Sequence, residues 1–410
     1  MTKGASDSKI IVRLDPPYLA TVAIAVALLF IGNRVATQGL AILPGDSQEV
    51  VRARALEVTQ RIQGAGAGDE ALDPGSVLFS LQGESVVFDA EISRGPRRGE
   101  IVSATQSFRG FVQYANAEVA PGDSILLISF GDEWFFNGFY RAGRLLWLGA
   151  IFAFCVLLFG RKKGFNTLLS LSLTCAAVFA VFIPSILTGK NIYLMALLTC
   201  AYTTAATLLI VIGFNKKSLA ALAGCMSGIA VAGLIALVMD RALFLTGVVD
   251  EHSRFLMNLP VDGSINLRAI VFAGIVIGAM GAIMDVAISV SSALWEIKES
   301  AVAVKPAALM RSGMAIGRDM FGTMANTLIL AYIGTSLSVI LILLVYTDSL
   351  ASLMNMEMIV VEVLQALCGS FGILSAIPIT SLFCSAIFSR PGGVQAGPAG
   401  WTNALDKGEP

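Results

Sequence analysis

Charged side chains are scarce in this sequence. Only 14% of its 410 residues are Asp, Glu, Lys or Arg, whereas 56% are hydrophobic and the mean hydropathy is +0.77. A chain of this length and composition is too apolar for an ordinary soluble enzyme, so the sequence predicts a polytopic membrane protein embedded in a lipid bilayer. The formal net charge of -1 gives no indication of a basic patch. Nucleic acid is therefore set aside as a partner.

Histidine and cysteine are also scarce. The chain has one histidine, His252, and no zinc-like Cys/His spacing, so the sequence predicts no metal site and no cofactor. A metal site around His252 is less favoured than a solvated side chain, although Asp250 and Glu251 precede it. The long polar region has no cysteine, and no disulfide framework is expected. All cysteines fall within predicted membrane spans: Cys155, Cys175, Cys200, Cys225, Cys368 and Cys384.

The local signatures of common enzymes are missing as well. No Gly-x-Ser-x-Gly elbow, His-Glu-x-x-His helix or Walker loop occurs. Asp285 preceded by Gly281 falls short of the Gly-x-Gly-Asp arrangement of intramembrane aspartyl proteases, and no second catalytic aspartate is evident. An enzyme is therefore the least supported class, and no catalytic residue is predicted. An intramembrane hydrolase that uses Asp285 and Glu362 is the weakest alternative.

Apolar runs dominate the rest of the chain. We expect a mainly α-helical membrane protein with about eight transmembrane helices, and counts of seven or nine stay open. The first run is interpreted as an uncleaved signal anchor rather than a cleavable signal peptide, because Asn33–Thr37 makes a poor cleavage site. A break at Asp240-Arg241 is one alternative within the fifth run. The runs cover roughly residues 18–31, 144–160, 165–187, 191–213, 218–245, 267–290, 321–346 and 358–388.

Residues 45–140 have a different pattern. Alternating or β-branched segments are separated by turn residues, which predicts a barrel or sandwich of about five to seven strands between the first and second spans. Gly64–Gly68 is interpreted as a flexible loop within it, or as a plain linker. The expected strands are Glu49–Val58, Ser76–Phe88, Gly99–Thr105 and Ser124–Ser129. The expected turns are Asp73-Pro74-Gly75, Arg94-Gly95-Pro96, Pro121-Gly122-Asp123 and Asn137-Gly138.

The distribution of basic residues predicts the orientation. Arg161-Lys162-Lys163, Lys216-Lys217 and Arg311 fall on the same side as the basic N-terminus, whereas the opposite loops are more acidic. Cytoplasmic loops carry excess Lys and Arg, so we expect both termini in the cytoplasm of a multi-pass protein of the bacterial cell membrane. The expected parts are 1–44 (N-terminus and first helix), 45–140 (extracytoplasmic β-domain), 141–390 (seven-helix bundle) and 391–410 (cytoplasmic tail).

One carboxylate lies deep inside an apolar run. A charge near the bilayer centre costs about 2.5 to 3.5 kcal/mol, so Asp285 is expected to face a bundle interior, a partner or water. We interpret its surroundings as a substrate- or ion-binding site. The alternative is that Asp285 bonds to a neighbouring helix as a packing contact. At helical spacing, its face also carries Gly278, Gly281, Ser289, Ser292 and Glu296.

The next span supplies candidate partners for Asp285. Thr323, Asn326 and Thr327 lie within one turn of each other, and we expect them to contribute to the same site. Arg318 and Asp319 come just before them and are weaker candidates, because an interfacial ion pair of little energetic value is equally compatible with the sequence.

Small residues predict close contacts between helices. Gly224-x-x-x-Gly228 and Gly274-x-x-x-Gly278 are spaced for helix packing, which is more often architectural than functional. The last span has a second small and polar seam and a proline, Pro378, that favours a kink. In that span and in the Asp285 span, Glu362 and Glu296 are weaker site candidates. The glycines expected at helix contacts are Gly278, Gly281, Gly322, Gly369 and Gly372.

The segments 278–289, 317–319 and 322–334 together resemble the bacterial YibE/F membrane proteins. The layout is also similar, with a first span, an extracytoplasmic β-rich segment and then Arg161–Gly164. The resemblance covers nearly the whole chain, although the β-segment is matched by pattern only. It implies a multi-spanning protein of the longer, YibE-like type with no agreed activity. It also suggests a second YibE/F-like subunit or a homo-oligomer as a partner.

Two functions remain open from the sequence. The first is a transporter or channel component with a polar intramembrane site around Asp285. The second is a non-transporting envelope or scaffold factor whose β-domain binds an extracytoplasmic partner, while the polar seams only hold the helices together.

Overall fold

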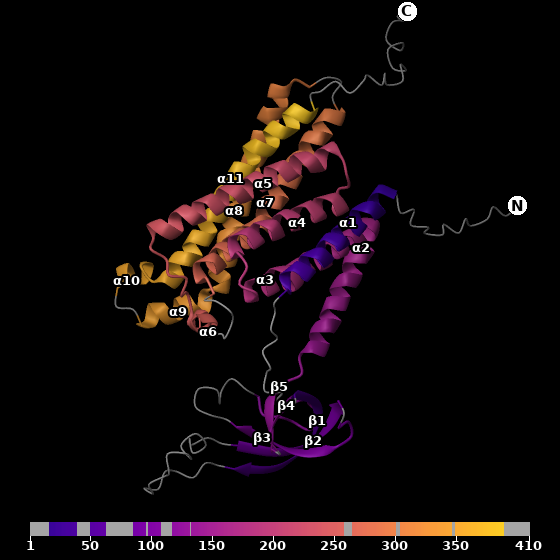
Figure 1. The fold of residues 1–410 in the computed structure, drawn as a ribbon, viewed down its shortest axis with the longest axis vertical. Helices are drawn as coiled ribbons and strands as arrows, with labels where there is room; N and C mark the ends of the chain where they lie inside the picture. The colour runs from indigo at the N-terminus through magenta and orange to yellow at the C-terminus, as the bar shows by residue number, and fades with distance from the viewer. Residues whose placement is uncertain are drawn as a thin grey trace, which may run out of the picture. The chain divides into compact units, whose positions relative to one another are not determined.

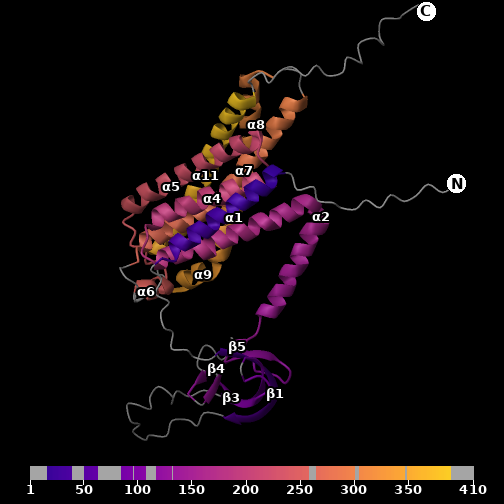
Figure 2. The same cartoon turned by 45° about the vertical axis from the view of Figure 1, so that its right-hand side comes forward.

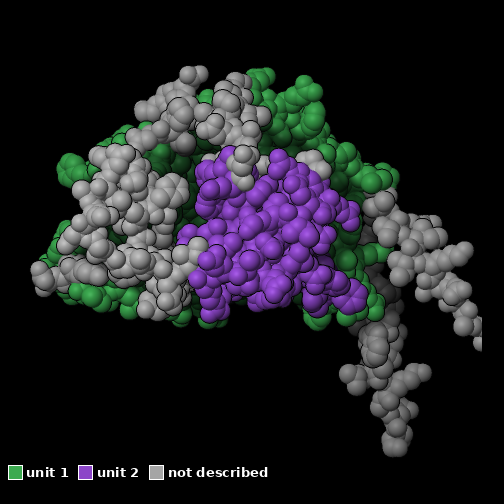
Figure 3. Space-filling view, turned by 90° about the horizontal axis from the view of Figure 1, so that it is seen from below, with its two compact units in different colours: residues 1–40, 156–410 green, residues 41–155 purple. Residues whose placement is uncertain are grey.

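The computed structural model describes residues 16–38, 50–62, 85–95, 97–107, 117–131, 133–257, 265–300, 304–346 and 349–388. The chain divides into two compact units, which are residues 1–40 with 156–410 and residues 41–155 (Figure 3). The fold class predicted from the sequence is confirmed, because the described chain is mainly helical and has a small β-barrel between its first two helices.

The second unit contains a closed barrel made by the strands of its described part. Its strand order is β1-β2-β3-β5-β4. Neighbouring strands are antiparallel except β3 and β5, which are parallel. This is the order of the five-stranded Greek-key barrel called the OB fold, and the fold alone assigns no ligand. The strands are β1 Val50–Ile62, β2 Ser85–Arg94, β3 Ile101–Ser107, β4 Ser124–Phe130 and β5 Glu133–Phe139.

Alternation along the strands fills the barrel. On β2, every second side chain from Val86 to Ile92 is buried, and Phe88 and Ile92 have no exposed surface. The side chain of Gln106 is also buried, since its Nε2 donates to the Ala117 carbonyl at 3.0 Å and its Oε1 accepts from the Val119 amide at 3.0 Å. Among the described residues, the barrel core is therefore apolar except for a glutamine whose polar groups are bonded.

The turn predictions had mixed outcomes. A turn does occur at Pro121-Gly122, where Gly122 has φ +93° and the Asp123 carboxylate accepts from the Ala120 amide at 2.9 Å. The turn expected at Asn137-Gly138 is wrong, because both residues lie inside β5. Leu126 pairs with Gly138 and Leu127 pairs with Phe136, so Asn137 is the extra residue of a β-bulge.

Some of the predicted β-domain lies outside the described residues. This applies to the Gly64–Gly68 loop, to the Asp73-Pro74-Gly75 turn and to Pro96.

Helices make up the first unit. Among the described residues, six helices are long and apolar enough to span a membrane, and a seventh span is counted if the bent pair α8 and α9 is one. The elements are α1 Pro16–Ala36, α2 Ala142–Ala177, a π-helical turn Val178–Phe182, α3 Ile183–Leu187, α4 Ile192–Val211, α5 Lys216–Ala242, α6 Glu251–Met257, α7 Leu267–Ser300, α8 Pro306–Thr335, α9 Leu337–Tyr346, α10 Leu350–Met354 and α11 Glu357–Phe388.

The difference from the expected eight spans arises mainly at α2. The helical segment Ala142–Leu187 counts once, yet it has 46 residues. One crossing of a bilayer needs about 20 residues, so this segment has enough residues for two crossings. Arg161 interrupts it with φ 48° and ψ −119°. A division at Arg161 would give the two runs 144–160 and 165–187 of the sequence-based count.

The apolar run predicted over 321–346 is divided between two helices, α8 and α9. Helix α8 begins at Pro306, since proline is well suited to the first turn of a helix. It ends at Thr335, and α9 continues at an angle of 61° to it. At the bend, the Thr335 hydroxyl and the Ser336 amide both donate to the Tyr332 carbonyl, at 2.9 and 3.1 Å. By contrast, α5 runs without a break through Asp240-Arg241.

Helices α5, α7 and α11 form the centre of the bundle, and α8 also packs along α11 (Figure 1). Their backbones approach closely at glycines. A Cβ on Gly228 of α5 would lie 2.6 Å from Ile283 Cγ2 of α7 and 2.7 Å from the Gly372 carbonyl oxygen of α11. One turn away on α5, Gly224 lies against Thr380. Gly224-x-x-x-Gly228 is therefore an architectural contact.

Helix α1 packs on the side of this bundle, beside α4 (Figures 1 and 2). Tyr18 donates to the Asn166 side chain at 2.9 Å, and Tyr202 donates to the Ala25 carbonyl at 3.0 Å. These hydrogen bonds join α1 to the second half of α2 and to α4.

We expect Gly224→Ala to lower the free energy of unfolding by about 1 to 3 kcal/mol, because the new methyl group would overlap Thr380. Gly149→Ala on α2 is the matched control, since no atom lies within 4 Å of its added Cβ. Thermal unfolding in detergent measures both variants. If Gly224→Ala unfolds at the same temperature as Gly149→Ala, the close contact between α5 and α11 is refuted.

Candidate functional site

The polar face of α7 lies on the outside of the helix bundle. Ile283, Val286 and Val290 have no exposed surface and point into the core. Asp285 is exposed. It points away from the core, as do the glycine and serine residues of its face. In that face, Gly274, Gly278, Gly281 and Glu296 are exposed, and Ser289 and Ser292 are half-buried.

Around Asp285 this face is open. No atom lies within 4 Å of a Cβ added to Gly274 or Gly281. Within the part of the chain that the structure describes, the Asp285 carboxylate has no hydrogen bond and no ion pair. Within the described residues, Asp285 therefore makes no hydrogen bond to a neighbouring helix.

The polar residues of α8 are exposed too. The Thr323 and Thr327 hydroxyls donate to carbonyls of their own helix, Met320 and Thr323, both at 2.9 Å. Among the described residues, these hydroxyls therefore make no hydrogen bond to Asp285. The exposed candidates on α8 are Arg318, Asp319, Gly322, Thr323, Asn326 and Thr327.

Two contacts set the relative depth of α7 and α8. A Cβ on Gly278 would lie 2.9 Å from the Tyr332 hydroxyl oxygen, and one on Gly313 would lie 3.0 Å from Leu294 Cδ1. Since the helices run in opposite directions, counting from either contact places Asp285 level with about residues 322–325 of α8. The candidate residues of both helices therefore lie at one level of the bundle.

A junction of three helices lies next to this face. Gly278 of α7 is close to two polar groups, because its added Cβ would lie 2.9 Å from Tyr332 Oη of α8 and 3.1 Å from Gln365 Nε2 of α11. Glu362, three residues before Gln365 on α11, is half-buried. The sequence indicated Glu362 as a weak candidate, but it did not connect Tyr332 and Gln365 to Gly278.

The glycines expected at helix contacts fall into two groups. Gly369 and Gly372 are buried in α11, where an added Cβ would lie 2.6 Å from Leu328 Cδ2 and 2.6 Å from Ile283 Cδ1 respectively. Gly281 and Gly322 are exposed, with no atom within 4 Å of an added Cβ. In the described chain, these two glycines therefore pack against no other helix.

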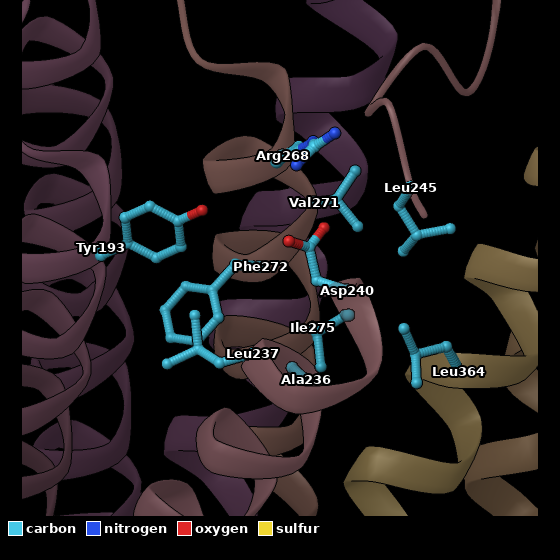
Figure 4. Close-up of a pocket in the computed structure, with 10 residues that line it drawn as sticks. All are labelled: Tyr193, Ala236, Leu237, Asp240, Leu245, Arg268, Val271, Phe272, Ile275 and Leu364. Atoms are coloured by element: carbon cyan, nitrogen blue, oxygen red, sulfur yellow. The ribbon is translucent and has the colours of Figure 1, made fainter. Parts of the chain in front are cut away.

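A small recess lies near the end of α5 (Figure 4). It has an empty volume of about 230 Å³, part of it open to the surroundings. Figure 4 shows the Asp240 carboxylate directed toward the end of α7 that carries Arg268 and Val271. The lining includes Tyr193 from α4 and is otherwise mainly apolar, with Ala236, Leu237, Leu245, Phe272, Ile275 and Leu364.

The loop after α5 is held beside this recess by Glu357 at the start of α11. Its carboxylate accepts from the Thr246 amide at 2.8 Å, the Thr246 hydroxyl at 2.7 Å and the Gly247 amide at 2.6 Å. Gly247 has φ +83°, and a Cβ there would lie 2.6 Å from the Arg268 amide nitrogen. Only glycine fits this position, and the loop places Leu245 in the wall of the recess.

The region around His252 is a helix start. Asp250 accepts from the Ser253 amide at 2.7 Å and from the Ser253 hydroxyl at 2.6 Å, so it caps α6. The Ser253 hydroxyl bond holds the pKa of the Asp250 carboxyl below its usual range. His252 is exposed. In the described chain, no group of three His, Cys, Asp or Glu side chains is arranged to hold a metal ion.

These features define the class of the protein: it is a multi-span membrane protein that has a helical bundle and a small β-barrel. The family model for YibE/F-like proteins matches residues 148–390. The chain therefore belongs to the YibE/F-like family, as its sequence resemblance indicated. The comparisons with curated proteins and with solved structures give no match.

We expect Glu357→Ala to release the loop after α5, because three donors lose a charged acceptor. Hydrogen bonds to a charged group contribute about 1.5 to 3 kcal/mol, so exchange of the Thr246 and Gly247 amides should accelerate by about tenfold or more. Glu357→Gln, which keeps one carbonyl acceptor, should show a smaller change. Hydrogen exchange detected by mass spectrometry measures the exchange rates of these amides, with the α6 peptide as internal reference. Equal exchange in all three proteins would disprove the role of Glu357.

Proposed function

We propose that this protein is a transporter or channel component whose polar pathway runs along the outer faces of α7 and α8. The observation that carries the proposal is the position of Asp285, exposed on the bundle at the same level as Thr323 and Asn326. A carboxylate at this depth of a membrane helix costs about 2.5 to 3.5 kcal/mol unless water or a partner surrounds it.

The residue types favour a cation or a proton as the transported species. Asp285 supplies one negative charge, and hydroxyl and amide oxygens such as those of Ser289 and Asn326 can replace water ligands of a hard cation. A carboxylate can also bind and release a proton during transport. Arg318, about one to two turns from the Asp285 level, would set the electrostatic boundary of this pathway on one side.

A second candidate function rests on the barrel. Its described strands expose four large apolar side chains, of which Ile101 at 63% and Phe130 at 52% are the most exposed, and the others are Val50 and Leu56. Such residues favour contact with another protein, as expected for an envelope or scaffold factor. In that case, removal of residues 45–140 would abolish function, whereas Asp285→Asn would be tolerated.

We expect Asp285→Asn to reduce ion flux by at least about tenfold, because the amide keeps the size of the side chain and removes its charge. The purified chain is reconstituted in liposomes, and flux of H⁺, Na⁺, K⁺ and Mg²⁺ is followed with ion-selective dyes. Glu299→Gln is the matched control, since Glu299 is an exposed acid of the same helix outside the proposed site. Unchanged flux in folded Asp285→Asn would rule the proposal out.

A further inference from the structure

The outer face of α7 differs from the outer faces of the other spans. Helices α1, α5 and α11 expose large apolar side chains, such as Phe30, Leu234 and Leu374, which suit contact with lipid. Between residues 274 and 285, α7 exposes three glycines and a carboxylate. Glycine provides little surface for lipid chains, and the carboxylate is costly there. Lipid is therefore a poor neighbour for this face.

We propose that a second copy of this chain covers the face formed by Gly274, Gly281, Asp285 and Ser292 of α7 together with the exposed polar residues of α8. This inference deepens the proposed function, because it places the proposed pathway between the two copies. Only that statement rests on the proposed function.

The first argument for a second copy is the spacing of small residues. Gly274, Gly278 and Gly281 recur at four and three residues, which allows a membrane helix to approach to backbone distance. Within the described chain, no helix takes the space beside Gly274 or Gly281. Since both copies have the same orientation in the membrane, a two-fold axis along the membrane normal can set the glycine face of α7 in one copy against α8 of the other.

The second argument is charge complementarity. The face carries two acids, Asp285 on α7 and Asp319 on α8, and one base, Arg318 on α8, all of them exposed. Arg318 lies four to seven residues beyond the level of Asp285, which is about 6 to 10 Å along the helix axis, within reach of a long arginine side chain. A two-fold rotation places the α8 face of one copy against the α7 face of the other. Asp285 and Arg318 can then pair twice across one symmetric interface.

The distinguishing experiment replaces Gly281 by leucine. In a single chain, Gly281→Leu has open space for its side chain, so the bundle should fold as before and lose no stability. Between two copies, leucine would keep the helices apart and weaken association by about tenfold or more. Gly149→Leu on α2 is the matched control, because its added Cβ also meets no atom within 4 Å.

The copy number is counted by stepwise photobleaching of the labelled full chain in dilute liposomes. We expect two steps for the wild type and Gly149→Leu and mainly one step for Gly281→Leu. One step for the wild type, or two steps for Gly281→Leu, would overturn the inference. Thermal unfolding of each variant confirms that it is folded.

The flux assay separates this result from the proposed function. If the wild type is a single copy and its flux still depends on Asp285, the inference fails while the proposed function stands. If the wild type is a pair and Asp285→Asn leaves flux unchanged, the proposed function fails while the interface stands. If Gly281→Leu loses both its partner and its flux, the pathway lies between the two copies.

Discussion

The close approach of α5, α7 and α11 is the constraint on which the rest of the bundle depends. Where Gly228 and Gly372 meet Ile283, no side chain on either glycine could be accommodated without moving a helix. This contact fixes the rotation of α7 about its own axis. Because Ile283 must point into the core, Asp285, two residues further along the helix, must point away from it. The exposure of the carboxylate is a consequence of the packing of Ile283 against two glycines.

The same constraint determines the position of α8. Gly313 and Gly317 of α8 lie against Ser381 and Ile377 of α11, so the first half of α8 is held to the core. Near its other end, Tyr332 reaches the junction beside Gly278. Between these contacts the polar residues of α8 are left on the outside, at the level of Asp285. Thus two helices that are adjacent in sequence present their polar faces at one depth, although no hydrogen bond in the described chain joins them.

The sequence predicted the spans, the barrel and the polar seam because each depends on a local pattern. Run length and hydropathy identify membrane helices, and alternation identifies the strands. The helical period placed Asp285 with Gly281 and Ser289 correctly, but it could not show which side of α7 faces the core. A face of glycine and serine can pack inward as well as outward. The choice depends on contacts with Gly228 and Gly372, which are distant in the sequence.

Long-range bonds explain the other differences. The bonds from Thr246 and Gly247 to Glu357 join residues more than a hundred positions apart, and no local pattern at either end indicates them. Asn137-Gly138 is a strong turn signal, yet pairing with Leu126 and Leu127 keeps it within a strand. In both cases, the partner that decides the structure comes from another element of the chain.

Helix α7 also connects two polar regions that are otherwise separate. Arg268 contributes to the recess near the end of α5, and Asp285 lies seventeen residues further on, roughly 25 Å along the helix. At this distance and with core packing between them, the two groups have little direct electrostatic effect on each other. Coupling would require α7 to move as a rigid element against α5 and α11. The glycine contacts with Ile283 oppose such a movement, so the recess and the Asp285 face are best regarded as independent sites on one fixed helix.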